Sequence, residues 1–185
     1  MKKLSAVKKI STFLLLGAVA IRATAASAPH VSRTVLKAVE LSLDEKLKTI
    51  WPENPFTLIG NTRGLYLDGY GALFTVEVSP ILSTTMMMHP TVTKEEAVKA
   101  HKLRIERVAQ LKVALKQAVV DAAASLDPVP ADDQITLIVF LQYHSWEDVS
   151  GTPAQLTFQG KKRALLDAKR AGGAAIAQAV QVTEN

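Results

Sequence analysis

Residues 65–78, with the sequence LYLDGYGALFTVEV, constrain the fold of this 185-residue chain more than any other stretch. Apolar and polar side chains alternate over residues 72–78, and a period of two indicates a strand with one buried face. Asp68, Gly69 and Tyr70 precede that run, and a glycine-containing pair at such a place is typical of a tight hairpin turn. The stretch therefore predicts a β-hairpin.

The number of residues in the turn decides which side chains of the first arm face the core. An even number would place Leu65 and Leu67 on the same face as Phe74 and Val76, whereas an odd number would place them on the other face. We expect the even turn, because it buries all four apolar side chains together.

The glycines of this stretch also raise the possibility of a phosphate-binding loop. A dinucleotide fingerprint needs a third glycine where this chain has Phe74, and it needs a helix to follow the loop. A strand is predicted there instead, so hairpin geometry explains the glycines better. Three polar residues near the hairpin, Arg63, Asp68 and Tyr70, remain candidates for lining a binding groove.

The hairpin resembles that of a loosely defined set of uncharacterised bacterial exported proteins, which share the pattern Tyr-x-x-Gly-Tyr-Gly-x-x-Phe. The matching residues here are Tyr66, Gly69, Tyr70, Gly71 and Phe74. The resemblance implies export and a small α+β domain. It implies no activity and transfers no catalytic residue.

The first 25 residues have the three-part layout of a secretory signal peptide. Four lysines precede an apolar run over residues 10–21, which is short for a membrane span, and small residues follow it. Cleavage after Ala25 is preferred over cleavage after Ala28, because Pro29 would hinder the second cut. We expect a signal peptide at residues 1–25 and a single α+β domain at residues 26–185, periplasmic rather than extracellular. The alternative is an uncleaved anchor or a buried helix.

Charge and cysteine content exclude several classes of function. The chain has 22 basic and 17 acidic residues, a net charge of +5 that by itself would suggest nucleic acid as a partner. Five of the basic residues lie within the predicted signal peptide, which leaves 17 basic residues against 17 acidic ones. We therefore expect no nucleic-acid partner and no stable membrane span after cleavage. Without cysteine, the chain has no disulfide, thiolate metal site or lipoprotein anchor.

A long helix is predicted after the hairpin. Thr93 and Glu96 form a capping-box pattern at its start, and no proline or glycine interrupts the chain from residue 94 to residue 126. A helix of this length exceeds a small sheet, so part of it is expected to project or to pack on another chain. Its predicted apolar stripe consists of Val98, His101, Ile105, Val108, Leu115, Val119, Ala122 and Leu126, with Arg107 largely off the stripe.

Shorter elements complete the predicted fold. The unbroken apolar run at residues 135–141 indicates a central strand covered on both faces. The class is α+β: a single mostly antiparallel sheet of about four or five strands, packed by the long helix and by shorter N- and C-terminal helices. The other predicted elements are helices at 29–40, from Ser42 to about 51, and from 161 to a C-cap at Gly172; strands at 56–60 and 155–159; and an ambiguous C-terminal segment, interpreted as a strand at 176–182.

Two further groups of residues are candidate sites. His144 and Trp146 are predicted to share one face at the end of the apolar strand, where they would serve ligand or partner binding together with the hairpin residues. Met86, Met88 and His89 form a weak candidate for copper, because thioether sulfur is a soft ligand suited to Cu(I). No zinc pattern occurs, and no cofactor is expected.

Catalysis has little support in the sequence. There is no cysteine and no G-x-S-x-G, and His144 and Ser145 would point to opposite faces of a strand. We expect an exported envelope protein that acts as a non-enzymatic binding or interaction module, with an envelope protein as partner or with self-association through the long helix. The alternatives are a periplasmic small-molecule or copper binder with a site near His144, Trp146 and the hairpin, and, third, a hydrolase.

Overall fold

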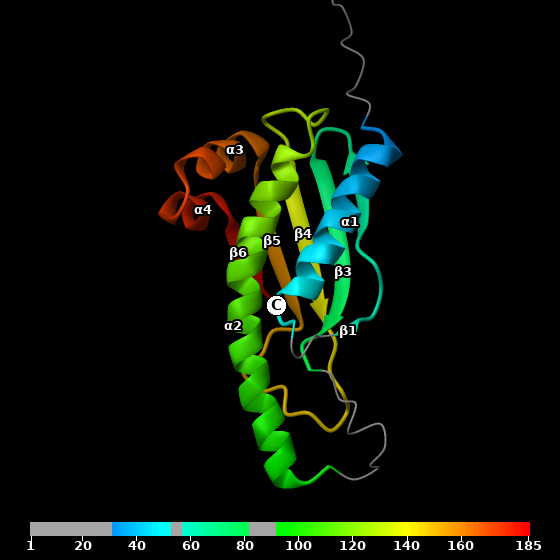
Figure 1. Ribbon diagram of the computed structural model, residues 1–185, viewed down its shortest axis with the longest axis vertical. Helices are drawn as coiled ribbons and strands as arrows, with labels where there is room; N and C mark the ends of the chain where they lie inside the picture. Colours follow the sequence, from blue (N-terminus) through cyan, green and yellow to red (C-terminus); the bar gives the residue numbers. More distant parts are fainter. Residues whose placement is uncertain (1–30, 53–56, 82–91) are drawn as a thin grey trace, which may run out of the picture.

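The computed structural model describes residues 31–52, 57–81 and 92–185, so the predicted signal peptide at residues 1–25 lies outside the described residues. The described chain is an α+β fold, with α1 and α2 crossing one face of a single mixed sheet (Figure 1). The helices are α1 (Arg33–Thr49), α2 (Lys94–Ala124), α3 (Lys162–Ala171) and α4 (Ala174–Ala179). The strands are β1 (Thr57–Leu58), β2 (Arg63–Leu67), β3 (Gly71–Ser79), β4 (Gln134–Leu141), β5 (Gln155–Lys161) and β6 (Gln181–Glu184).

The sheet has the order β1-β3-β4-β5-β6, and β2 pairs with β3 farther along the edge that β1 also borders. β3 and β4 are parallel, with Phe74 beside Leu137, whereas every other described pairing is antiparallel. The parallel pair requires a crossover, which α2 supplies. The predicted fold class is confirmed.

The core lies between the sheet and its helices. Alternate side chains of each central strand point toward α1 and α2, as period-two patterning requires. Phe74 and Val76 are buried as predicted, and so are the inward-facing residues of β5. The largest members of this core include Leu47, Phe74, Leu111, Leu115, Leu137, Leu156, Phe158 and Leu165.

The turn of the β2–β3 hairpin differs from the prediction. Leu67 pairs with Gly71, so the turn contains three residues rather than an even number. Leu65 consequently lies opposite Leu73, and the side chains of Leu65 and Leu67 are 43% and 46% exposed on the face away from the helices. The expected burial of these two leucines is therefore wrong. The intervening Tyr66 points to the helix side instead.

The odd turn follows from two glycine positions. Gly69 has a φ of 76°, and the amide of Tyr70 closes the turn on the carbonyl of Leu67 at 3.1 Å. Gly71 has a φ of 130°, and a Cβ at this residue would lie 2.0 Å from the carbonyl oxygen of Gln134. Only glycine accommodates both the dihedral angle and the close approach of β4.

Two buried carboxylates fasten α1 to the start of the hairpin. Glu40 accepts a hydrogen bond from the amide of Gly64 at 2.8 Å and pairs with Arg33 at 2.5 Å. Burial raises the pKa of Glu40, but Arg33, the Gly64 amide and Lys37 together outweigh burial and hold that pKa below its usual value. Asp44 accepts from the amide and hydroxyl of Thr62, at 2.8 and 2.6 Å.

The N- and C-terminal helices also differ from the prediction. α1 is one helix capped by Ser32, and the predicted cap Ser42 is an exposed residue within it. A continuous buried stripe explains this, because Leu36, Val39, Leu43 and Leu47 repeat at helical spacing across the predicted break. At the other end, α4 occupies the first part of the segment predicted as a strand, and β6 begins only at Gln181.

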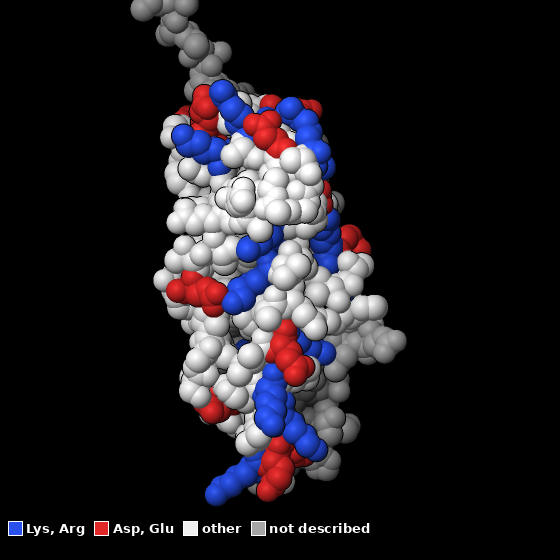
Figure 2. Space-filling model, turned by 90° about the vertical axis from the view of Figure 1, so that its left-hand side faces the viewer, with Lys and Arg blue, Asp and Glu red and all other residues white. Residues whose placement is uncertain are grey.

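The long helix α2 has the predicted capping box at Thr93 and Glu96. Its N-terminal turns extend past the end of the sheet, beside the segment that joins β4 to β5 (Figure 1). Basic and acidic side chains are interleaved along the side of the molecule that carries α2 (Figure 2). In these first turns the predicted stripe is wrong: Val98 and Ile105 are exposed, whereas Arg104 and Arg107 are buried.

Candidate docking face

The hairpin tip is bound to the neighbouring strand. The carbonyl of Tyr70 accepts a hydrogen bond from the amide of Gln134 at 2.8 Å, and its hydroxyl is hydrogen-bonded to the hydroxyl of Thr136 at 2.9 Å. Asp68 is exposed at the turn, and Arg63 is exposed at the far end of β2. Tyr70 thus helps to join β3 to β4, and its side chain remains half-exposed.

Tyr66 fastens the other side of the hairpin. Its hydroxyl donates to Asp133 at 2.8 Å, just before β4 begins. Burial and the negative charge of Asp133 raise the pKa of Tyr66 to about 12. With Phe74 in the core, the aromatic residues of the Tyr-x-x-Gly-Tyr-Gly-x-x-Phe pattern all have structural contacts.

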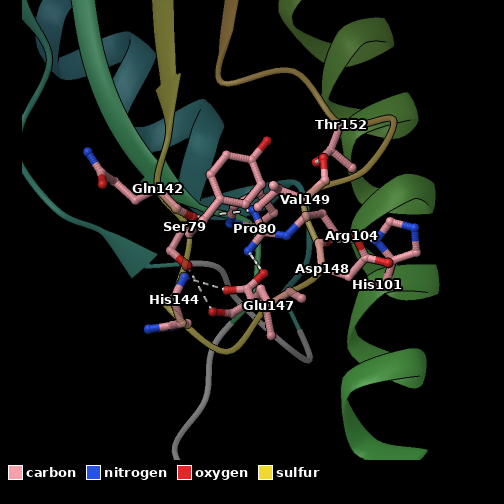
Figure 3. Close-up of polar contacts among 12 residues, drawn as sticks. Ser79, Pro80, His101, Arg104, Gln142, His144, Glu147, Asp148, Val149 and Thr152 are labelled. Atoms are coloured by element: carbon pink, nitrogen blue, oxygen red, sulfur yellow. Dashed lines mark hydrogen bonds and ion pairs between the residues drawn. The ribbon is translucent and has the colours of Figure 1, made fainter. Parts of the chain in front are cut away.

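A charged cluster lies at the opposite end of the sheet, where the segment after β4 meets the first turns of α2 (Figure 3). Arg104 is fully buried, forms an ion pair with Glu147 and donates to the carbonyl of Gln142 at 3.3 Å. Its guanidinium carbon lies 4.2 Å from the ring centroid of Tyr143. The Nε of Arg104 has no hydrogen-bond partner among the described residues.

The same segment holds the predicted pair His144 and Trp146. Both residues lie beyond the end of β4, and their rings stack with centroids 5.5 Å apart and an interplanar angle of 8°. The amide of His144 donates to Glu147 at 2.9 Å, and Nδ1 of His101 is hydrogen-bonded to the carbonyl of Asp148 at 2.9 Å. The hydrogen bond from His101 joins the segment to α2, and the other contacts lie within the segment.

The structure therefore separates the two predicted groups of site residues. Tyr70 adjoins the first residue of β4, whereas His144 follows its last residue, Leu141. Tyr70 and His144 are therefore separated by the paired length of β3 and β4, which is about 25 Å at roughly 3.3 Å per residue. His144 and Trp146 come together, but they do not share a site with Asp68 and Tyr70.

Within residues 31–52, 57–81 and 92–185, no group of three or more His, Asp or Glu side chains is arranged to hold a metal ion. Met86, Met88 and His89, the weak copper candidate, lie outside the described residues. In the part of the chain that the structure describes, no helix combines the length and apolar character needed to cross a bilayer.

The sheet face opposite α1 and α2 carries the most extensive apolar surface that the strands present. Tyr70 and Phe140 are 39% and 36% exposed there, beside the two exposed leucines of β2. This differs from the prediction that β4 is covered on both faces, because Ile138 and Phe140 point away from the helices. We call this surface the open face and define its apolar part as Leu65, Leu67, Tyr70, Leu73, Ile138 and Phe140.

Polar side chains border the apolar part of the open face. One border is a hollow of about 170 Å³, whose lining includes Arg63, Thr75, Glu77 and Phe140. The other lies on β5 and β6, where the outward positions are Gln155, Thr157, Gln159, Gln181 and Thr183. An apolar centre with a polar rim is the usual composition of a protein–protein contact surface.

Comparisons with protein-family models, with curated proteins and with solved structures give no match to this chain. The sequence does not predict the open face, although the residues of this face occupy alternate positions along β2 and β4. No local pattern reports which face of a strand a helix covers.

Proposed function

We propose that this protein is an exported, non-enzymatic interaction module that binds another protein surface through the open face. The supporting observation is the group of large apolar side chains that lies exposed on the sheet. Soluble proteins rarely leave contiguous apolar patches in water unless the patch serves binding. Burial of this patch against a partner would be favourable by the same hydrophobic effect that forms the core.

At the open face, the size of the hollow favours a protein over a small molecule as the partner of that face. Pockets for drug-sized ligands enclose roughly 300–1,000 Å³, whereas the hollow beside Phe140 encloses about 170 Å³. That volume accommodates one side chain of a partner. The alternative of a ligand site between the hairpin and His144 gains no support, because those groups lie at opposite ends of the sheet.

The N-terminal pattern supports the exported location. Lysines, an apolar run and small residues follow one another over residues 1–25, as in secretory signal peptides. The equal numbers of acidic and basic residues in the remainder suit a protein partner better than nucleic acid.

Single-cysteine labelling in intact producing cells tests both parts of the proposal. The chain has no cysteine, so Leu67→Cys and Val113→Cys each provide one reactive site, on the open face and on the outer side of α2. The reagent is a maleimide that cannot cross the inner membrane, used after the outer membrane has been permeabilised. For each variant, the labelling rate in cells is divided by the labelling rate of the same variant after purification, measured at low protein concentration.

We expect Cys at position 67 to react several-fold more slowly in cells than in the dilute purified protein, because a partner covers it. Cys at position 113 should react at similar rates in both. Equal ratios for the two variants would contradict a covered open face. A lack of labelling at position 113 in cells would contradict export.

A further inference from the structure

We infer that the occupant of the open face is a second copy of this chain, packed face to face about a twofold axis, with Arg63 of each copy paired to Glu77 of the other. This inference rests on the proposed function, because it assigns the partner of the same surface. It is carried by the placement of two opposite charges, by the extent of the face and by the arrangement of apolar and polar residues on it.

The two charges lie close together without neutralising each other. Arg63 is opposite Thr75 in the hairpin, and Glu77 follows two residues later on the same face of β3. Both line the hollow beside Phe140. Among the described residues the side chain of Arg63 has no hydrogen bond or ion pair, and the carboxylate of Glu77 accepts one long hydrogen bond, from Gln142 at 3.4 Å. Each charge is therefore available to a partner.

A surface with one positive and one negative group side by side is complementary to itself under twofold rotation. Contacts across a twofold axis occur in pairs, so an Arg63–Glu77 contact in one direction is repeated in the other. An axis parallel to the two sheets and passing near Thr75 would produce both contacts. Facing sheets lie about 10 Å apart, a gap that an arginine and a glutamate side chain span together.

The extent of the open face suits such a dimer. With strands about 4.8 Å apart and roughly 3.3 Å per residue, the face covers on the order of 500 Å² in plan. Because side chains project from this plane, the solvent-accessible area of the face is larger than its plan area. It approaches the roughly 800 Å² that each partner buries in a standard interface. Ile138, which pairs with Thr75, would lie near the axis, and the Gln and Thr side chains of β5 and β6 would lie toward the edge of the sheet.

The long helix offers a weaker surface for self-association. Val98, Ile105 and Val113 are exposed on α2. However, charged residues of both signs are interleaved along this side of the molecule (Figure 2), which makes it a solvated surface. The open face is therefore the better surface for a second copy.

Charge reversal with mixing tests the pairing. Arg63→Glu places two acidic groups on the face, and Glu77→Arg places two basic groups there. In a dimer of either variant alone, groups of like charge face each other and repel. In a mixed dimer, the acidic groups of one variant face the basic groups of the other, so both contacts are again between opposite charges. Sedimentation velocity of the exported protein should show that the wild type is a dimer. Each variant alone should dimerise at least tenfold more weakly, a change of about 1.4 kcal/mol or more. Mixing the two variants should restore dimerisation.

The matched controls are Asp167→Arg and Arg170→Glu, which reverse an exposed ion pair on α3 with an N–O distance of 3.4 Å. They should leave dimerisation unchanged, and circular dichroism should show that all four variants are folded. Single open-face variants that dimerise like the wild type, or a mixture that does not recover, would overturn the pairing. A monomeric wild type with position 67 protected in cells would overturn the second copy and keep the proposed function; a monomer without that protection would overturn both.

Discussion

Three cationic side chains are buried among the described residues, and each donates to backbone carbonyl groups. Lys162 donates to the carbonyls of residues 126, 127 and 129 at 2.7–3.0 Å, so its ammonium group binds the turn that follows α2. Arg107 donates to the carbonyl of Pro80 at 2.6 Å and lies over the ring of Trp51. Burial lowers the pKa of both Lys162 and Arg107. The sequence cannot predict these positions, because the acceptors belong to segments distant along the chain.

Two glycines of the hairpin provide a prediction about stability. Gly69→Ala should cost about 1–2 kcal/mol, because alanine is disfavoured at positive φ but has open space at this residue. Gly71→Ala should cost more, about 3 kcal/mol or above, because strain adds to a clash with the backbone of β4. Urea unfolding of both variants measures the difference. Equal losses would show that Gly71 is not set by the approach of Gln134.

Single elements show where patterns in the sequence are informative and where they are not. Alternation correctly places Phe74 and Val76 of β3 in the core, and the capping box correctly starts α2. The even turn is predicted because it would bury Leu65 and Leu67, but the actual turn depends on how closely β4 approaches Gly71. The apolar run of β4 predicts a strand covered on both faces, but a local run cannot report whether a second layer exists.

The segment between β4 and β5 provides a prediction at this scale. Arg104→Leu would leave the carboxylate of Glu147 buried without its ion pair, which typically costs about 3–5 kcal/mol. The double variant Arg104→Leu, Glu147→Leu removes both charges and should recover a large part of that loss. Hydrogen exchange should show faster exchange of the His144 amide in the single variant, because this amide donates to Glu147.

Urea unfolding of the wild type, both single variants and the double variant completes a thermodynamic cycle. Losses that simply add would mean that the two side chains do not interact. Such a result would contradict the assignment of this cluster as the connection between α2 and the segment after β4.

In the whole molecule, helices and sheet form a two-layer fold with one layer of helices (Figure 1). The class of fold could be predicted because element types and order follow from local periodicity. The candidate site could not, because the open face combines Leu65 and Leu67 with Ile138 and Phe140 from a strand some seventy residues away. Of the five predicted binding residues, Arg63 and Tyr70 lie at this surface and Asp68 is exposed in the hairpin turn, whereas His144 and Trp146 lie at the end of the sheet.

In the working protein, we expect the open face to pack against a second copy of the chain. Phe140→Glu places a charge in the apolar part of this face, whereas Val113→Glu places the same charge on the 74% exposed outer side of α2. Because both native residues are exposed, each variant is expected to fold like the wild type.

Sedimentation equilibrium of the wild type and these two variants is the most direct measurement. We expect the wild type and Val113→Glu to be dimers at the same concentration and Phe140→Glu to be a monomer. One association state for all three proteins, whether monomer or dimer, would contradict the pairing of two copies through the open face.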